Sequence, residues 1–433
     1  MTTAQSNIAV TIYNNNIALV REVRPIQLDK GRQEFRFTDV AAQIDPTSVH
    51  FKSLNMPDGI QLLEQNYEYD LIGTERLLTK YLDQGIVATT KEGKTFSGKL
   101  LNSQNNDIIV QTTEGIKVLR AAFVETIEFP QLPTGLITKP TLVWLMECKK
   151  AGQHDAEISY LTNGLKWHTE YVSVINEKDT ELELSGWVSI ENNSGATFNE
   201  AKLKLVAGDV NLAKTPPGPI RLERAMAMAD VSYAPFEEKS FFEYHLYTLQ
   251  RPATLADRQI KQVTLFTPSK VAVKKKFVFD PRQDETKVQV KLEFKNDQQS
   301  GLGMPLPKGK IRVYKKDTDG SQEFIGEDWI DHTPKDEQVR VDVGKAFDIV
   351  AQRTVKEQKE ISKRVTQQTI QVELRNRKSE AITISVFDYF YGDWDFVGPT
   401  PPVKKKDAEK VEFEVPIAAD SEKTIIYTVT LKR

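Results

Sequence analysis

The feature that most constrains this chain is the alternation of apolar and polar residues with a period of two. Between Glu181 and Ile190, leucine, valine and isoleucine side chains fall on one face, and glutamate and serine side chains fall on the other. Such alternation is typical of a half-buried β-strand, so we predict an all-β protein with few helices. The same period recurs at residues 288–294, 370–374, 382–386, 411–415 and 425–431.

Short turn sequences separate the predicted strands. Asn163-Gly164, Asn193-Ser194-Gly195 and Asp319-Gly320 supply residues that tolerate a positive φ, as tight hairpins require. Many antiparallel strands joined by short loops are typical of a β-sandwich. We therefore expect antiparallel sandwiches, immunoglobulin-like in shape, over the second half of the chain. The proline-rich run at 214–219 should break regular structure.

One segment differs from this pattern. Residues 74–82 have leucine and tyrosine at helical spacing, with Thr74 as the expected N-cap. Five short strands then follow between Gly85 and Phe129, separated by turns such as KEGK and TEG. A short helix followed by five short strands resembles a small SH3-like or Sm-like barrel.

The length of 433 residues predicts two to four domains. We divide the chain into an N-terminal β-domain (1–70), the helix and five-stranded barrel insert (71–130), a central β-sandwich region (131–280) and a C-terminal immunoglobulin-like sandwich (281–433).

Composition excludes several classes of protein. With 39% hydrophobic and 27% charged residues, the chain is an ordinary globular protein. A net charge of -3 gives no basic field for nucleic acid. Cys148 is the one cysteine, so no intrachain disulfide is expected, and its apolar surroundings indicate an inert thiol. The sequence has neither the features of a signal peptide nor a transmembrane segment.

The densest polar cluster is GEDWIDHTP, which holds Asp328, Asp331 and His332. Two carboxylates and an imidazole could bind a divalent cation or position a general base. The alternative is a structural role, in which the Asp331 carboxylate accepts backbone N–H bonds where the strand ends. We favour the structural role, because a zinc site needs three or four ligands and no second ligand motif is visible. No metal or cofactor is predicted.

Two further groups of residues are candidates for binding. Trp167 and His168 follow a tight turn, and His168 would gain interest if it lay near His332. Tyr389, Tyr391 and Trp394, in DYFYGDWDF, could form a patch that stacks on sugars or contacts a partner. The alternative is a strand end whose aromatic rings belong to the core.

Seven segments of the chain carry a resemblance to a known family. They are YNNNIALVRE (13–22), YLTNGLKWHTEYV (160–172), GWVSIENNSGATFNEAKLKLVAGDVN (186–211), YHLYTL (244–249), GEDWIDHTPKDEQVRVDVGKAFDIV (326–350), VELRNRKSEAITI (372–384) and VEFEVPI (411–417). In this order they resemble the mucoidy-inhibitor-like family, whose C-terminal domain has no known function. The resemblance implies a bacterial protein exported to the periplasm or cell surface, and no reaction is established for such proteins. Two departures are the missing signal peptide and the barrel insert, where many relatives carry a coiled coil or nothing recognisable.

We therefore expect a non-catalytic scaffold of the cell envelope, or a secreted one, that binds a protein or glycan partner. Its location should be periplasmic or extracellular, or cytoplasmic if the native chain starts here. The alternative is a metal-assisted hydrolase centred on Asp331 and His332. RNA binding through the small barrel comes third, because five basic and five acidic residues cancel between Gly85 and Phe129. Self-association is left open.

Overall fold

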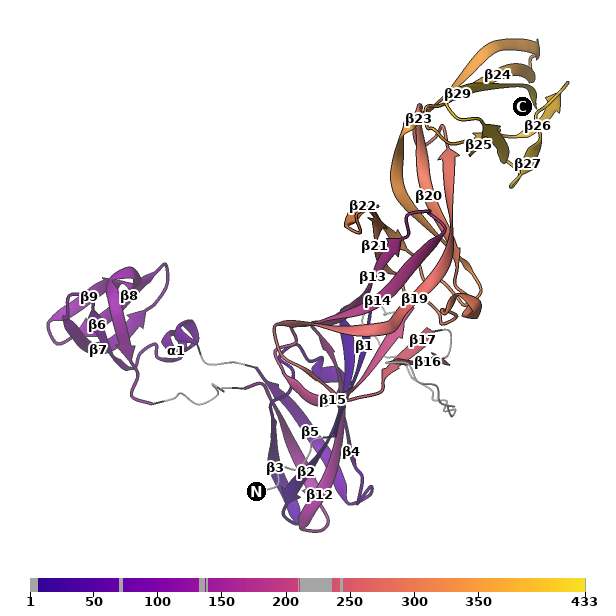
Figure 1. The fold of residues 1–433 in the computed structure, drawn as a ribbon. Helices are drawn as coiled ribbons and strands as arrows, with labels where there is room; N and C mark the ends of the chain where they lie inside the picture. Colours follow the sequence, from indigo (N-terminus) through magenta and orange to yellow (C-terminus); the bar gives the residue numbers. More distant parts are fainter. Residues whose placement is uncertain are drawn as a thin grey trace. The chain divides into compact units, whose positions relative to one another are not determined.

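The computed structural model describes residues 7–69, 73–131, 137, 139–208, 210, 236–241 and 244–432. Within them the chain forms 29 strands, one α-helix and three 3-10 helices, so the all-β prediction is confirmed (Figure 1). The run at 214–219 lies outside the described residues.

The chain divides into two compact units, and each is assembled from separate segments. The boundaries predicted after residues 130 and 280 fall inside unit 1 and unit 2, respectively. Unit 1 is Met1–Lys166, Glu191–Lys204 and Arg251–Ile260; unit 2 is Trp167–Ile190, Leu205–Gln250 and Lys261–Arg433.

Unit 1 contains two antiparallel sheets that face each other. Trp144 lies at their centre, fully buried, and its ring packs against Phe37 in its own sheet and against Phe51 in the other, each at 5.4 Å. Its indole nitrogen donates to Gln65 at 2.8 Å, so the polar atom is satisfied. One sheet has the order β15 (Phe198–Ala207), β1 (Asn7–Tyr13), β2 (Ile17–Leu28), β12 (Gly152–Asn163) and β4 (His50–Ser53), with β18 (Ala253–Leu255) beside β15; the other has the order β3 (Gly31–Thr38), β11 (Thr141–Cys148) and β5 (Ile60–Glu68), and η1 (Pro46–Ser48) precedes β4.

The predicted insert forms a sheet and a core of its own. The helix α1 (Thr74–Lys80) buries Leu78 and the following Tyr81 against Ile86, Leu100 and Val110 of the strands. Gly73, not Thr74, is the N-cap residue, and no side chain caps the helix. The strand order is β10 (Val124–Glu128), β6 (Gly85–Thr90), β7 (Thr95–Asn102), β8 (Asp107–Thr112) and β9 (Gly115–Arg120), with η2 (Ala121–Phe123) between β9 and β10.

The prediction of a closed small barrel needs correction. The end strands β9 and β10 are joined by three residues only, so the sheet must curl until its ends lie within about 14 Å at that corner. Nevertheless the described residues of β9 pair only with β8, and those of β10 pair only with β6. The five predicted strands are present, but they form an open, curled sheet.

The register of unit 1 explains why an insert is tolerated here. Strands β5 and β11 are antiparallel neighbours, and Glu68 lies directly opposite Thr141. Without the residues between them, these two strands would form a simple hairpin. The insert, from α1 to β10 (residues 74–128), therefore lies at the tip of a β5–β11 hairpin. We call it the α1–β10 body.

Unit 2 is built on one long sheet. The parallel pair β13–β21 sets neighbouring strands in register from Thr169↔Gly309 to Ile175↔Lys315. The predicted Asp319-Gly320 hairpin joins β21 to β22, and Gly320 has the expected positive φ of 88°. The order is β22 (Gln322–Ile330), β21 (Gly309–Lys316), β13 (Leu165–Ile175), β14 (Glu181–Asn192), β19 (Gln259–Phe279), β20 (Lys287–Lys295), β23 (Gln338–Ser362), β24 (Val365–Asn376), β29 (Ser421–Lys432) and β26 (Asp393–Val397); β16 (Phe236–Phe241) and β17 (Tyr244–Leu249) form a hairpin, and η3 (Gln298–Ser300) follows β20.

The C-terminal part of unit 2 is a two-layer sandwich, as predicted. Strand β25 (Ile382–Tyr389) pairs with β19 and with β28 (Lys410–Ile417), and β27 (Val403–Lys405) pairs with β28. Their apolar faces pack on β23, β24 and β29 around Phe413 and Tyr427, whose rings stack at 4.6 Å. Within the described part of the chain, no helix has the length and hydrophobicity to cross a membrane.

Candidate functional site

A network of charged and polar side chains crosses one exposed face of the unit 2 sheet. It begins at Glu170 on β13, where the carboxylate accepts a hydrogen bond from Gln262 on β19 at 3.0 Å. Ser189 on β14 lies between these strands and contacts both side chains, at 3.4 Å from Glu170 and 3.0 Å from Gln262. The consecutive strands β13 and β14 and the later strand β19 therefore share one polar contact.

The network continues toward the edge of the sheet. Arg312 on β21 lies 3.7 Å from Glu170 and 3.5 Å from Glu327 on β22. Lys310 lies 3.2 Å from the same Glu327 carboxylate. The register explains these contacts, because Arg312 is directly opposite Glu327 and parallel pairing places Glu170 beside Lys310.

Aromatic side chains lie on the same face as these charges. Trp329 is directly opposite Lys310, is 59% exposed, and has the Lys310 ammonium 5.7 Å from its ring. Phe324, 55% exposed, packs edge-on against Tyr314 at 5.7 Å. We call this surface the Trp329 face; it comprises Glu170, Lys310, Arg312, Tyr314, Phe324, Glu327 and Trp329.

The charges of the Trp329 face cancel. Glu170 and Glu327 carry two negative charges, and Lys310 and Arg312 carry two positive charges. Each carboxylate is within 4 Å of a cation, so the partners are held in place without a strong net potential. The face can offer shape, aromatic area and oriented charge pairs to a partner.

The predicted candidates Trp167 and His168 are separated by their strand, because successive side chains point to opposite sides. Trp167 is buried in the core, where its indole nitrogen donates to the carbonyl of Val206 at 3.3 Å. His168 is on the exposed side, with its Nε2 3.7 Å from Glu170. Only His168 therefore adjoins the Trp329 face.

Asp328 has a structural position. One carboxylate oxygen accepts the backbone N–H of Trp329 at 2.8 Å, and the other accepts that of Asp342 on β23 at 2.7 Å. Nearby, a Cβ added to Gly326 would lie 2.2 Å from the Val343 carbonyl oxygen, so glycine permits this close approach of β22 and β23. The hydrogen bond from Asp342 to the Asp328 carboxylate thus links β23 to β22.

The role expected for Asp331 needs correction. Its side chain is 92% exposed, and its carboxylate makes an ion pair with Lys308 at 3.6 Å. The backbone N–H bonds that we expected at Asp331 are formed by Asp328. His332 does have a local structural contact, since its Nδ1 accepts the backbone N–H of Lys308 at 3.0 Å.

Among the described residues, no three His, Cys, Asp or Glu side chains are grouped so that they could hold a metal ion. Both oxygens of Asp328 are bonded to backbone groups, and Asp331 points to solvent. The acidic and histidine residues of the GEDWIDHTP motif thus serve backbone contacts and exposed ion pairs.

The predicted aromatic patch is divided between surface and core. The guanidinium of Arg282 lies over the ring of Tyr389, 3.4 Å from its centroid, and 5.1 Å from that of Tyr391. Tyr389 also donates to Asp280 at 2.8 Å. Trp394 is 7% exposed and donates to the Ala408 carbonyl, so its ring has no open face for a sugar.

Sequence reasoning missed most of the Trp329 face. The signal was present in KIRVYKK, where Lys310 and Arg312 alternate with the buried Ile311 and Val313. This pattern predicts which side of β21 is exposed. It does not predict that Glu170, more than 130 residues earlier, lies on the adjacent strand.

No protein-family model matches this chain, and no curated protein matches it. The function must therefore be argued from the surfaces of the molecule.

Proposed function

We propose that this chain is a non-catalytic scaffold of the cell envelope or the extracellular space, and that it binds a protein partner through the Trp329 face. The observation that carries the proposal is Trp329 itself: a large aromatic side chain that is 59% exposed beside an organised network of ion pairs. Tryptophan, tyrosine and arginine are the residues in which protein interfaces and their hot spots are enriched.

A protein partner fits this surface better than a glycan or a nucleic acid. The charged groups already pair with one another, so few unpaired donors and acceptors remain for sugar hydroxyls. The four charged side chains of the Trp329 face sum to zero, so this face provides no attraction for phosphates. By contrast, exposed aromatic area on β22, the last strand of its sheet, is what a protein surface covers on binding.

The proposed location is supported by the resemblance of seven segments to the mucoidy-inhibitor-like family. One of them, 326–350, contains Trp329 and Glu327. The two other functions considered have less support. A hydrolase at Asp331 and His332 would need converging ligands or a base, whereas the Asp331 carboxylate is exposed and pairs, among the described residues, with Lys308. RNA binding would need a basic surface on the small sheet.

Site-specific cross-linking tests the proposal. Phe324 is replaced by a photoreactive phenylalanine analogue, and the protein is irradiated with envelope fractions of the source cells. A discrete protein adduct is expected at position 324, and its yield should fall at least about tenfold in a Trp329→Ala background.

The matched control is the same analogue at Phe347, which is 92% exposed and lies on β23 of the same unit. Adducts formed at position 347 measure chance encounters with other proteins. Equal adduct yields at positions 324 and 347, or an adduct at 324 whose yield is unchanged in Trp329→Ala, would refute the proposed face. Retention of envelope polysaccharide without a protein adduct would show that the partner is a glycan.

A further inference from the structure

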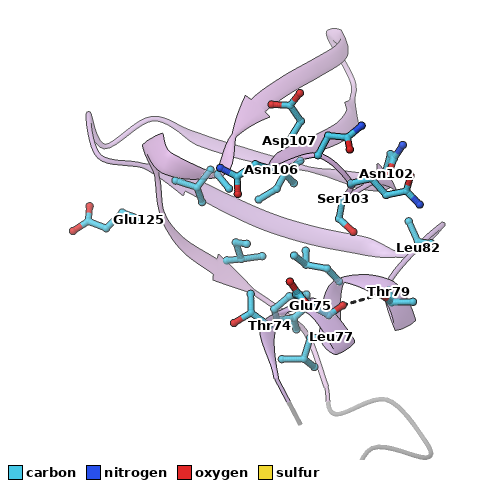
Figure 2. Close-up of a pocket in the computed structure, with 18 residues that line it drawn as sticks. Thr74, Glu75, Leu77, Thr79, Leu82, Asn102, Ser103, Asn106, Asp107 and Glu125 are labelled. Atoms are coloured by element: carbon cyan, nitrogen blue, oxygen red, sulfur yellow. Dashed lines mark hydrogen bonds between the residues drawn. The ribbon is translucent and has the colours of Figure 1, made fainter. Parts of the chain in front are cut away.

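The α1–β10 body contains a groove of about 1000 Å³ between α1 and the open side of its sheet. Figure 2 shows α1, with Thr74, Glu75 and Leu77, on one side of the groove and the 102–107 loop on the other. This volume is at the upper end of the range of about 300–1,000 Å³ for small-molecule pockets.

The floor of the groove is apolar. Val124, Ile127 and Phe129 pack against the core of this body and are only partly buried. Leu82, at the end of the helical turn, is 40% exposed and lines the same groove. Apolar side chains at the edge of a small core gain stability when another apolar group covers them.

The charged residues of the groove have one sign. Glu75, Asp107 and Glu125 line it, and no lysine, arginine or histidine does. Three other acidic groups of the same body do have basic partners: Asp83 pairs with Lys99 at 2.7 Å, Glu92 with Lys94 at 3.1 Å, and Glu114 with Lys117 at 3.5 Å.

Within the described residues, the carboxylates of Glu75, Asp107 and Glu125 make no ion pair. Residues 73–131 as a whole have seven basic and seven acidic side chains, so the charge of this body is zero but unevenly distributed. Three carboxylates without an ion pair beside an apolar floor make a groove that complements a ligand carrying positive charge and apolar side chains.

We propose that this groove binds an extended segment of a partner protein in which lysine or arginine alternates with large apolar residues. The apolar side chains occupy the floor formed by Val124, Ile127 and Phe129. The basic side chains meet the three carboxylates at the rim. This is a second surface, and it does not depend on the Trp329 face.

The probe is a short fluorescein-labelled peptide in which leucine and lysine alternate, titrated with the full chain and followed by anisotropy. Two further peptides separate the contributions: glutamate replaces lysine in one, and alanine replaces leucine in the other. We expect saturable binding of the Leu/Lys peptide only, weakened as salt rises from about 50 to about 300 mM.

The test variant is the triple change Glu75→Gln, Asp107→Asn and Glu125→Gln. Three lost charge contacts should weaken binding about tenfold or more. The matched control removes the same charge outside the groove through Asp83→Asn, Glu92→Gln and Glu114→Gln, and should bind like the wild type.

Leu82→Ala tests the apolar floor at an exposed position, where folding is not at risk, and should also weaken binding. Equal weakening by the two triple variants would mean a diffuse electrostatic effect and overturn the proposal. Equal binding of the Leu/Glu peptide, or no binding of the Leu/Lys peptide, would overturn it as well.

Discussion

Two segments of unit 2 are alike in sequence and opposite in environment. Both contain an Asp-Trp pair on the end strand of the main sheet path, β22 in one case and β26 in the other. Trp329 is 59% exposed, whereas Trp394 is 7% exposed and packs on Phe390 with ring centres 5.1 Å apart. The same two residue types thus produce a surface feature in one strand and a core feature in the other.

The residue that follows each tryptophan explains the difference. After Trp329 comes Ile330, which is 3% exposed, so the alternation of the strand turns Trp329 outward. After Trp394 comes Asp395, and Asp393 precedes it, so both neighbours face solvent and the tryptophan takes the core side. In these two strands, therefore, the residues beside the tryptophan indicate which side of the strand its ring takes.

The largest expected effect is at Trp394. Trp394→Ala should lower the free energy of unfolding by about 3–5 kcal/mol, because it leaves a cavity among aromatic rings. Trp329→Ala should change it by less than about 0.5 kcal/mol. Denaturant unfolding of the two variants measures both values. Similar losses would show that the two tryptophans do not differ in burial.

The second comparison sets a buried charge network against the exposed one. Asp388 is 3% exposed, and its two carboxylate oxygens share the Nε–H of Arg353, each at 3.0 Å. The carboxylate also accepts hydrogen bonds from the Tyr427 hydroxyl and from the backbone N–H of Tyr389. Asp388→Ala should cost about 2–4 kcal/mol, since three donors, on Arg353, Tyr427 and the Tyr389 backbone, lose their buried acceptor.

The matched change in the exposed network is Glu327→Ala. It should cost no more than about 1 kcal/mol, because exposed ion pairs contribute little to stability. Thermal and denaturant unfolding of both variants decide the point. A larger loss for Glu327→Ala than for Asp388→Ala would contradict the assignment of the two networks.

The third comparison is between the neighbours Asp328 and Asp331. Asp328→Ala should cost about 1–3 kcal/mol, because two backbone N–H groups lose their acceptor. Asp331→Ala should be within about 0.5 kcal/mol of the wild type, since this side chain is exposed. The reverse order in an unfolding experiment would restore the role predicted from sequence.

A smaller effect depends on pH. Burial raises the pKa of Asp179, but hydrogen bonds from Lys275 and Lys315 outweigh it, so the pKa lies below its ordinary value of 3.8. A carboxylate with a lowered pKa stabilises the fold above that ordinary value, and the contribution disappears as pH falls below it.

Asp179→Asn should therefore cost about 1–2 kcal/mol at neutral pH, and the difference from the wild type should shrink below about pH 4. Unfolding measured between neutral and acidic pH checks this. An unchanged difference down to about pH 2 would show that the carboxylate charge is not responsible.

Local pattern predicted much of this fold. The strands of the insert, the hairpin at Asp319-Gly320 and the alternating strands of the C-terminal sandwich follow from residue period and turn chemistry. Sheet closure did not follow, because it depends on how strongly five strands curl. The inserted position between Glu68 and Thr141 also depends on a pairing across more than 70 residues.

The candidate site was predicted only in part. His168 and the GEDWIDHTP motif led to the correct strands, β13 and β22. The sequence does not reveal that β21 separates them and brings Arg312 between Glu170 and Glu327. Long-range strand order, which local periodicity cannot encode, assembled the Trp329 face.

The most direct test of the Trp329 face is the affinity of the cross-linked partner for purified wild type, Trp329→Ala and Phe347→Ala proteins. We expect Trp329→Ala to weaken binding about tenfold or more with an unchanged melting temperature, and Phe347→Ala to bind like the wild type. Equal affinity of all three proteins would contradict the assignment of this face as the recognition surface.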